Sequence, residues 1–74
     1  MSRTLLIIHE NPRVCMEILE STDWKKLDFS RTDMRFSYEE GRKAAQSYPY
    51  SLVLLDARIQ GRSGLDLIRA VQGS

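Results

Sequence analysis

The sequence contains a single cysteine, Cys15, so an internal disulfide framework is excluded. A lone thiol fits a reducing compartment, and its apolar neighbours Val14 and Ile18 predict a small buried hydrophobic side chain rather than a reactive one. No apolar run approaches the roughly 20 residues that a membrane-spanning helix needs, and no signal peptide follows the first residues. We therefore expect a cytoplasmic protein that does not enter a membrane.

An excess of charge of one sign is also lacking. The 74 residues include 11 Lys and Arg and 10 Asp and Glu, for a formal net charge of +1, and no long run of either sign occurs. The chain thus has no basic surface typical of binding to nucleic acid or to an anionic membrane. Walker and dinucleotide-binding glycine patterns, a basic helix-turn-helix and internal repeats are absent too. A chain of this length forms one small domain or part of one.

Short apolar runs predict three strands. Residues 5–8 (Leu-Leu-Ile-Ile) and 52–55 (Leu-Val-Leu-Leu) are too short for helices, and the second run is typical of a strand buried on both faces. The run over 29–36 is more polar, which suits a strand at the edge of a sheet. Trp24, in the polar connection before it, is expected to pack over that edge.

Capping signals place helices between these strands. Asn11 and Pro12 are an N-cap and a first-turn proline for a helix over 12–20. Ser37 opens a Ser-x-x-Glu capping box for a second helix, which Pro49 ends.

The second helix carries a narrow face of small side chains, which would let it lie close to a sheet. These residues are Gly41, Ala44 and Ala45. Ser63 and Asp66 form a similar cap for a last helix, whose apolar face includes Leu65, Ile68 and Val71. Because strands and helices alternate strictly, we expect an α/β fold with a parallel sheet covered by helices.

Three polar side chains follow the two apolar strands. If the strand order is 2-1-3, the first and third strands end side by side, and His9, Glu10 and Asp56 meet at one rim. Carboxylates there could hold Mg²⁺. The backbone donors that could receive an anion belong to Gly61, Ser63 and Gly64. Such a set fits an aspartyl-phosphate acceptor, although an Asp that only ends a strand and opens a turn is the alternative.

These residues resemble the receiver domain of two-component response regulators. Residues 5–12 are similar to the family's first strand, acidic pair and proline, residues 51–56 to its phosphoacceptor strand, and residues 57–65 to the loop before its third helix. Residues 23–29 are similar to a subgroup joined to AraC-type DNA-binding domains. The resemblance implies a flavodoxin-like, three-layer sandwich, of which residues 1–74 would form the amino-terminal part, with the first three βα units.

The resemblance also implies roles for single residues. Asp56 matches the phosphorylated aspartate, and Glu10 matches the second residue of the Mg²⁺-binding acidic pair. Arg58 matches the position whose backbone carbonyl completes the metal shell. His9 stands where the family usually has its first acid, and imidazole is a poor ligand for a hard cation. A histidine that bonds locally is therefore favoured over a metal-binding one.

Receivers have five strands and five helices, whereas three of each are expected here. The family's switch Thr or Ser and its phosphate-binding Lys come from later strands, so phosphorylation at Asp56 would be impaired. The implied function is a non-enzymatic phosphorelay module of a transcriptional regulator, with a sensor histidine kinase as partner and no direct contact with nucleic acid. The open third strand would favour a homo-oligomer. Two alternatives are a phosphorylation-independent interaction or dimerisation module and a small phosphate or nucleotide binder.

Overall fold

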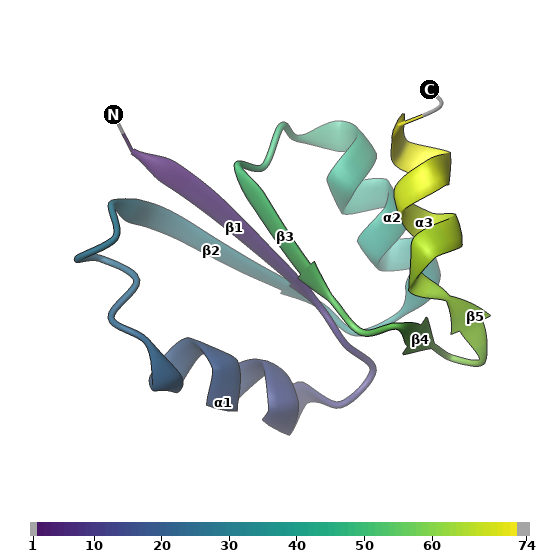
Figure 1. Ribbon diagram of the computed structural model, residues 1–74, viewed down its shortest axis with the longest axis horizontal. Coiled ribbons are helices and arrows are strands. Elements are labelled where there is room, and N and C mark those ends of the chain that lie inside the picture. The colour runs from purple at the N-terminus through teal and green to yellow at the C-terminus, as the bar shows by residue number, and fades with distance from the viewer. Residues whose placement is uncertain (1, 73–74) are drawn as a thin grey trace.

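A computed structural model describes residues 2–72 and contains a parallel sheet with helices on both faces (Figure 1). In chain order the elements are β1 (Arg3–Ile8), α1 (Pro12–Ser21), β2 (Phe29–Arg35), α2 (Tyr38–Ser47), β3 (Leu52–Leu55), β4 (Arg58–Ile59), β5 (Arg62–Ser63) and α3 (Gly64–Gln72). Apart from β4 and β5, these are the helices and strands that the apolar runs and caps predict. No helix within residues 2–72 has both the length and the apolar character needed to cross a membrane.

The main sheet has the order β2-β1-β3, with both pairs of strands parallel. The predicted α/β class and strand order 2-1-3 are therefore confirmed. The polar strand β2 lies at an edge, as its composition predicts. The register pairs Ile8 with Leu55, so β1 and β3 end at the same level.

The central strand β1 supplies the core of the molecule. Its last four residues, Leu5 to Ile8, are at most 1% exposed. Because side chains alternate across a strand, Leu6 and Ile8 pack on the side of α2 and α3, whereas Leu5 and Ile7 pack with Cys15 on the side of α1. Figure 1 shows the strands running between α1 and the pair formed by α2 and α3.

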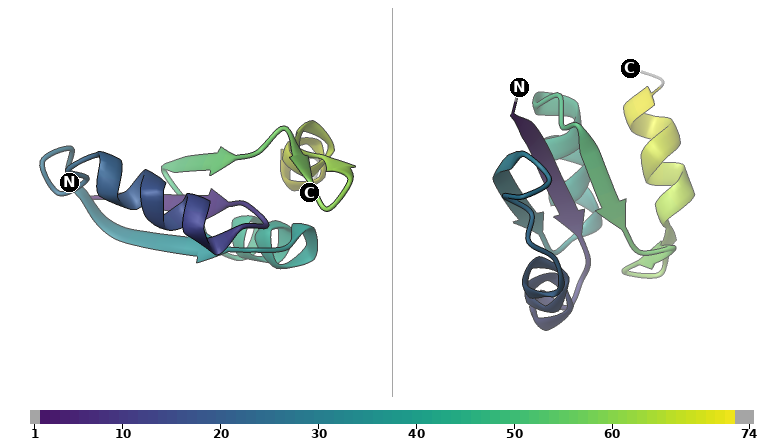
Figure 2. Two further views of the ribbon diagram at one scale, coloured as in Figure 1. Left: turned by 90° about the horizontal axis from the view of Figure 1, so that it is seen from below. Right: turned by 60° about the vertical axis from the view of Figure 1, so that its left-hand side comes forward.

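The prediction that residues 52–55 are buried on both faces is wrong. Leu52 is 38% exposed, and the other three residues of β3 are only half-buried. Among the described residues, β3 has a strand neighbour on one side alone, which is β1. In the right-hand view of Figure 2, β3 forms the margin of the sheet. The centre of the sheet is β1, so β1 rather than β3 is the strand that both layers of helices cover.

The helix caps predicted at Asn11 and Ser37 are formed, whereas the cap predicted from Ser63 and Asp66 is not seen: Ser63 ends β5 and α3 begins at Gly64. The Asn11 side chain accepts a hydrogen bond from the Arg13 backbone N–H at 3.0 Å, and the Ser37 hydroxyl accepts one from the Glu40 N–H at 3.1 Å. The small-residue face of α2 lies against β1, because a Cβ atom at Gly41 would come within 2.6 Å of the Ile8 side chain. The close approach expected from Gly41 is thus present.

The connection between α1 and β2 is closed by Trp24. Its indole ring packs edge-on against Phe29, with ring centroids 5.4 Å apart, and its Nε1 donates to the Ile18 carbonyl at 3.3 Å. Trp24 therefore has the packing role that the sequence predicts. Cys15, which is fully buried under the same connection, is the small hydrophobic residue expected there.

Candidate functional site

His9 and Asp56 meet at the carboxyl ends of β1 and β3. Each residue directly follows its strand, and the level ends of the two strands set them side by side. His9 Nε2 lies 3.3 Å from Asp56 Oδ2. The Asp56 side chain is 42% exposed and the His9 side chain 22% exposed, so solvent reaches the carboxylate while the imidazole is partly covered. The structure thus brings together two of the three residues expected at this rim.

A backbone hydrogen bond to Nδ1 orients the His9 ring. Its Nδ1 accepts the backbone N–H of Asn11 at 3.0 Å. A ring nitrogen that accepts a hydrogen bond carries no proton, so in the neutral ring the proton lies on Nε2, the nitrogen that is 3.3 Å from Asp56 Oδ2. His9 therefore makes the local bond that the sequence favours, and its other ring nitrogen lies within ion-pair distance of the candidate phosphoacceptor.

Glu10 follows His9 at the same rim, and its side chain is exposed. Within residues 2–72, no three His, Cys, Asp or Glu side chains are grouped in a way that could hold a metal ion. His9 offers a nitrogen where a hard cation prefers oxygen, and its Nε2–H would compete with the cation for Asp56. The donor set therefore fits Mg²⁺ poorly, and the assignment of Glu10, Asp56 and Arg58 as ligands stays a prediction.

The segment after Asp56 is a β-hairpin that the sequence did not predict. β4 and β5 pair antiparallel, and the two turn residues Gln60 and Gly61 have φ values of 54° and 75°. Positive φ at both positions is the mark of a type I′ turn, which matches the twist of short hairpins. Ile59 is fully buried in the cluster formed with α2 and α3. The hairpin is therefore part of the core rather than a free loop.

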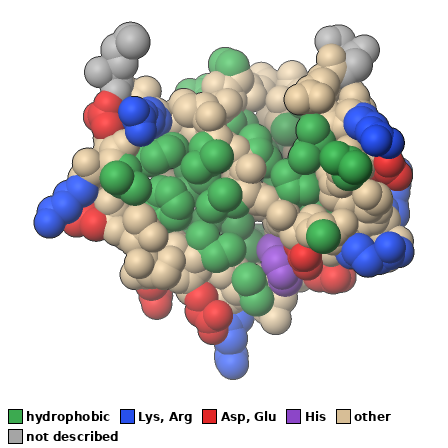
Figure 3. Space-filling model, in the orientation of Figure 1, with side chains coloured by type: hydrophobic (Ala, Val, Ile, Leu, Met, Phe, Trp, Pro, Cys, Tyr) green, Lys and Arg blue, Asp and Glu red, His purple; other side chains and the backbone are tan. Residues whose placement is uncertain are grey.

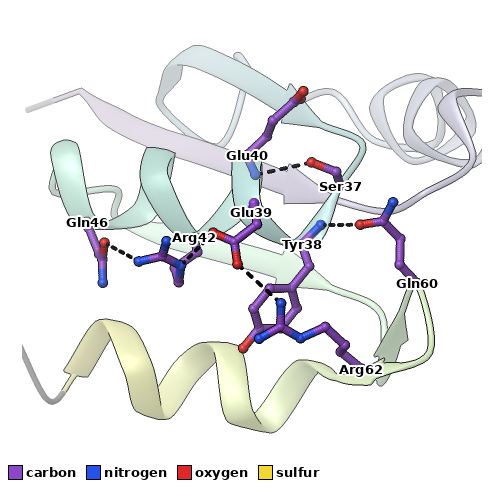
Figure 4. Close-up of polar contacts among 8 residues, drawn as sticks. All are labelled: Ser37, Tyr38, Glu39, Glu40, Arg42, Gln46, Gln60 and Arg62. Atoms are coloured by element: carbon purple, nitrogen blue, oxygen red, sulfur yellow. Dashed lines mark hydrogen bonds and ion pairs between the residues drawn. The ribbon is translucent and has the colours of Figure 1, made fainter.

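The hairpin is fastened to the first turn of α2 (Figure 4). Gln60 Oε1 accepts the backbone N–H of Tyr38 at 2.9 Å. The Arg62 guanidinium lies 3.6 Å from the centre of the Tyr38 ring, and its Nη1 is 3.2 Å from Glu39 Oε1. Hydrogen bonds from Arg42 and then Arg62 hold the pKa of Glu39 below its ordinary value. The chain leaving Asp56 is thus linked to α2 by a neutral hydrogen bond, a cation–π contact and an ion pair.

The residues proposed for anion binding lie in or next to this hairpin. Gly61 is in the turn, where its carbonyl accepts a hydrogen bond from the Arg58 side chain at 2.8 Å. Ser63, in β5, pairs with Arg58 of β4. The backbone N–H of Gly64 donates to the Ala57 carbonyl at 2.8 Å, so it is not open to an anion. The anion-binding role of Gly61 and Ser63 stays a prediction, whereas the backbone donor of Gly64 is already bonded to Ala57.

Gly64 has a clear steric role. It is buried at the start of α3, where a Cβ atom would lie 2.3 Å from the carbonyl oxygen of Asp56 and 2.5 Å from Leu55 Cδ1. Because the first of these atoms belongs to the backbone, it has little freedom to move away. Glycine therefore lets α3 begin directly against the carboxyl end of β3.

A second polar cluster lies on β2, and sequence reasoning assigned it no role. Asp33 Oδ2 accepts hydrogen bonds from the Tyr50 hydroxyl and from Arg31 Nε, the latter at 2.9 Å. The guanidinium of Arg31 also lies 4.2 Å from the centre of the Tyr48 ring. The spacing of Arg31 and Asp33, two residues apart on one face of a strand, is the signal that could have paired them. The cluster joins β2 to the connection between α2 and β3.

Comparison of the chain with protein-family models, with curated proteins and with solved structures returns no match. The function is therefore argued from the geometry of the rim.

Proposed function

We propose that this chain is a receiver-type signalling module with Asp56 as an impaired phosphoacceptor. The observation that supports the proposal is the contact between His9 Nε2 and Asp56 Oδ2 at the carboxyl ends of adjacent parallel strands. A flavodoxin-like architecture, a cytoplasmic location and a role in transcription regulation belong to the same proposal. The phosphoryl donor would be a sensor histidine kinase.

The chemistry needs one free carboxylate oxygen. His9 Nε2 lies 3.3 Å from Oδ2 of Asp56, so Oδ1 is the oxygen that would attack the phosphorus atom of a phosphohistidine or of a small phosphoramidate. The new O–P bond forms as the P–N bond breaks, and the leaving nitrogen takes up a proton. Transfer of this kind depends on cations that offset the phosphoryl charge. Because His9 stands in place of an acidic metal ligand, the reaction should be slow.

Intact mass spectrometry after incubation with phosphoramidate and Mg²⁺ tests this proposal. We expect a slowly formed adduct of one phosphoryl group on the wild-type protein and none on the Asp56→Asn variant. The His9→Asp variant should react about tenfold faster, because it restores an oxygen ligand and frees Oδ2 of Asp56. Omission of Mg²⁺ should abolish the faster phosphorylation of the His9→Asp variant.

Two results would contradict the acceptor role. One is an adduct that persists in Asp56→Asn, because the phosphoryl group would then reside elsewhere. The other is the absence of any adduct in both the wild-type protein and the His9→Asp variant, provided that circular dichroism shows both to be folded. The second result would favour a phosphorylation-independent interaction module, in which Asp56 lies beside His9 and takes up no phosphoryl group.

A further inference from the structure

The described part of the chain has two open sheet edges with opposite character. At one edge, β2 presents Ser30, Arg31, Thr32 and Asp33, which are polar or charged. At the other edge, β3 consists of four apolar residues, and Leu52 is 38% exposed. Charged side chains protect an edge strand from pairing with other chains, whereas an apolar edge favours pairing.

Apolar grooves flank β3 on both faces of the sheet. On the α2–α3 side, a groove of about 270 Å³ is lined by Ala45, Val53, Leu55, Leu67, Ile68 and Val71. On the α1 side, a groove of about 280 Å³ is lined mainly by Ile7, Ile18 and Leu54, with His9 and Asp56 at its end. The space-filling view shows hydrophobic side chains over the strands and over α3 on this face of the molecule (Figure 3). A strand that fits here must therefore be apolar on both of its faces.

The grooves require a strand that is apolar on both faces, and β3 itself is such a strand. We infer that β3 pairs with β3 of a second copy of the chain. Of the two open edges, only β3 supplies apolar side chains to both grooves at once, whereas β2 would bury Arg31 and Asp33 there. A closed two-chain assembly uses the same surface on both chains. Two copies of β3 that meet around a two-fold axis run antiparallel, and the result is a continuous six-stranded sheet.

Charges at the ends of β3 agree with an antiparallel arrangement. Arg3, at the amino end of the central strand β1, lines one groove with Ser51, Leu52 and Asp28, the last of which comes directly before β2. Asp56 lies at the carboxyl end. Antiparallel pairing centred between Val53 and Leu54 brings Arg3 of one copy toward Asp56 of the other. The net charge of +1 per chain adds little repulsion between the copies.

Sedimentation equilibrium over a range of micromolar concentrations tests this pairing. We expect a reversible dimer of about 17 kDa, twice the 8.6 kDa of one chain, as befits a small interface. The Leu52→Lys variant places a charge on the edge and should weaken the dimer at least about tenfold. The matched control is Leu27→Lys, at a comparably exposed leucine (47%) away from the sheet, and its dimer should have wild-type affinity.

Hydrogen exchange of the wild-type protein is an independent measurement that needs no variant. Backbone amides of β3 should exchange more slowly at high than at low protein concentration, while those of β2 should show no such change. A monomer at every concentration would overturn the proposal and leave the edge to a different protein. An assembly larger than two chains would overturn it as well, and so would equal weakening by Leu52→Lys and Leu27→Lys in folded protein.

Discussion

Asp33 is a half-buried carboxylate that accepts hydrogen bonds from the side chains of Tyr50 and Arg31. The hydrogen bond from Tyr50, followed by the charge and hydrogen bond of Arg31, holds its pKa below the ordinary value. Burial and the proximity of Asp33 raise the pKa of Tyr50. A carboxyl group whose pKa is lowered by folding stabilises the folded state above its unfolded pKa of about 3.9. That contribution is lost as the pH falls through the lower, folded pKa.

We therefore expect the free energy of unfolding to depend on Asp33 in a pH-dependent way. At pH 7 the Asp33→Asn and Tyr50→Phe variants should each be less stable by about 1 kcal/mol, the scale of a partly exposed hydrogen bond to a charged group. As the pH falls below the unfolded pKa of about 3.9, the difference from the wild-type protein should shrink for both variants, because Asp33 is protonated first in the unfolded and then in the folded state. Urea unfolding at a series of pH values measures this, and an undiminished difference in acid would contradict it.

At the scale of elements, the contact between α2 and β1 depends on the absence of a side chain at Gly41. Alanine is the better helix former by about 1 kcal/mol, so helix propensity alone predicts a more stable protein. A Cβ atom at this position, however, would lie 2.6 Å from Ile8 Cγ2 and 2.8 Å from Ile8 Cδ1, in a fully buried side chain. Steric overlap of this kind outweighs the gain in propensity.

The Gly41→Ala variant should therefore be destabilised by about 1–3 kcal/mol, the usual cost of overpacking a core. Thermal unfolding followed by circular dichroism is the measurement. Gln46→Ala, at an exposed position of the same helix, is the matched control and should change stability by less than about 0.5 kcal/mol. A Gly41→Ala protein more stable than the wild type would show that α2 can move away from β1 at no cost.

The longer elements could be predicted because their signals are local. Asn11 and Ser37 cap the helices that follow them, and each apolar run marks its own strand. The hairpin gave no such signal, since β4 and β5 have two residues each and Gln-Gly is not a usual type I′ pair. The strained φ of Gln60 is offset by its hydrogen bond to Tyr38, 22 residues away in sequence. A contact of that separation is not visible in a local pattern.

The candidate site also combines features that could be predicted from the sequence with features that could not. The meeting of His9 with Asp56 follows from strand order, because each residue comes directly after its strand. The proton position on His9 depends on the Asn11 amide, and the exposure of β3 depends on which strands lie beside it. The Asn11 amide is only two residues from His9, so a local bond could be predicted there, whereas the partial exposure of β3 depends on its neighbours in the sheet and not on its own apolar composition.

At the scale of the whole molecule, β1 makes the two layers one cooperative unit. A chain of this length has a total stability of about 4–11 kcal/mol, and truncation of a fully buried leucine removes about 2–5 kcal/mol of it. Leu6 packs toward α2 and α3, whereas Trp24 packs on the α1 side. If the layers were independent, a change at Leu6 would leave the surroundings of Trp24 intact.

The Leu6→Ala variant should therefore shift the urea midpoint seen by Trp24 fluorescence and the midpoint seen by far-ultraviolet circular dichroism equally. Coincident transitions are the sign of two-state unfolding. Leu27→Ala, at a leucine that is 47% exposed, is the control and should move neither midpoint by much. A fluorescence transition that stays in place while the dichroism midpoint falls would show that the α1 layer unfolds separately.

The separation of β1 from β3 in the sequence also bears on the order of folding. Thr4 and Ser51 hydrogen-bond across 47 residues of sequence, so β1 gains its second neighbour only after β3 has been synthesised. Helices form locally in about a microsecond, whereas parallel strands must wait for long loops to close. Until then the side chains of Leu5 to Ile8, at most 1% exposed in the folded chain, lack the cover of β3, so chaperones would bind β1 of the nascent chain.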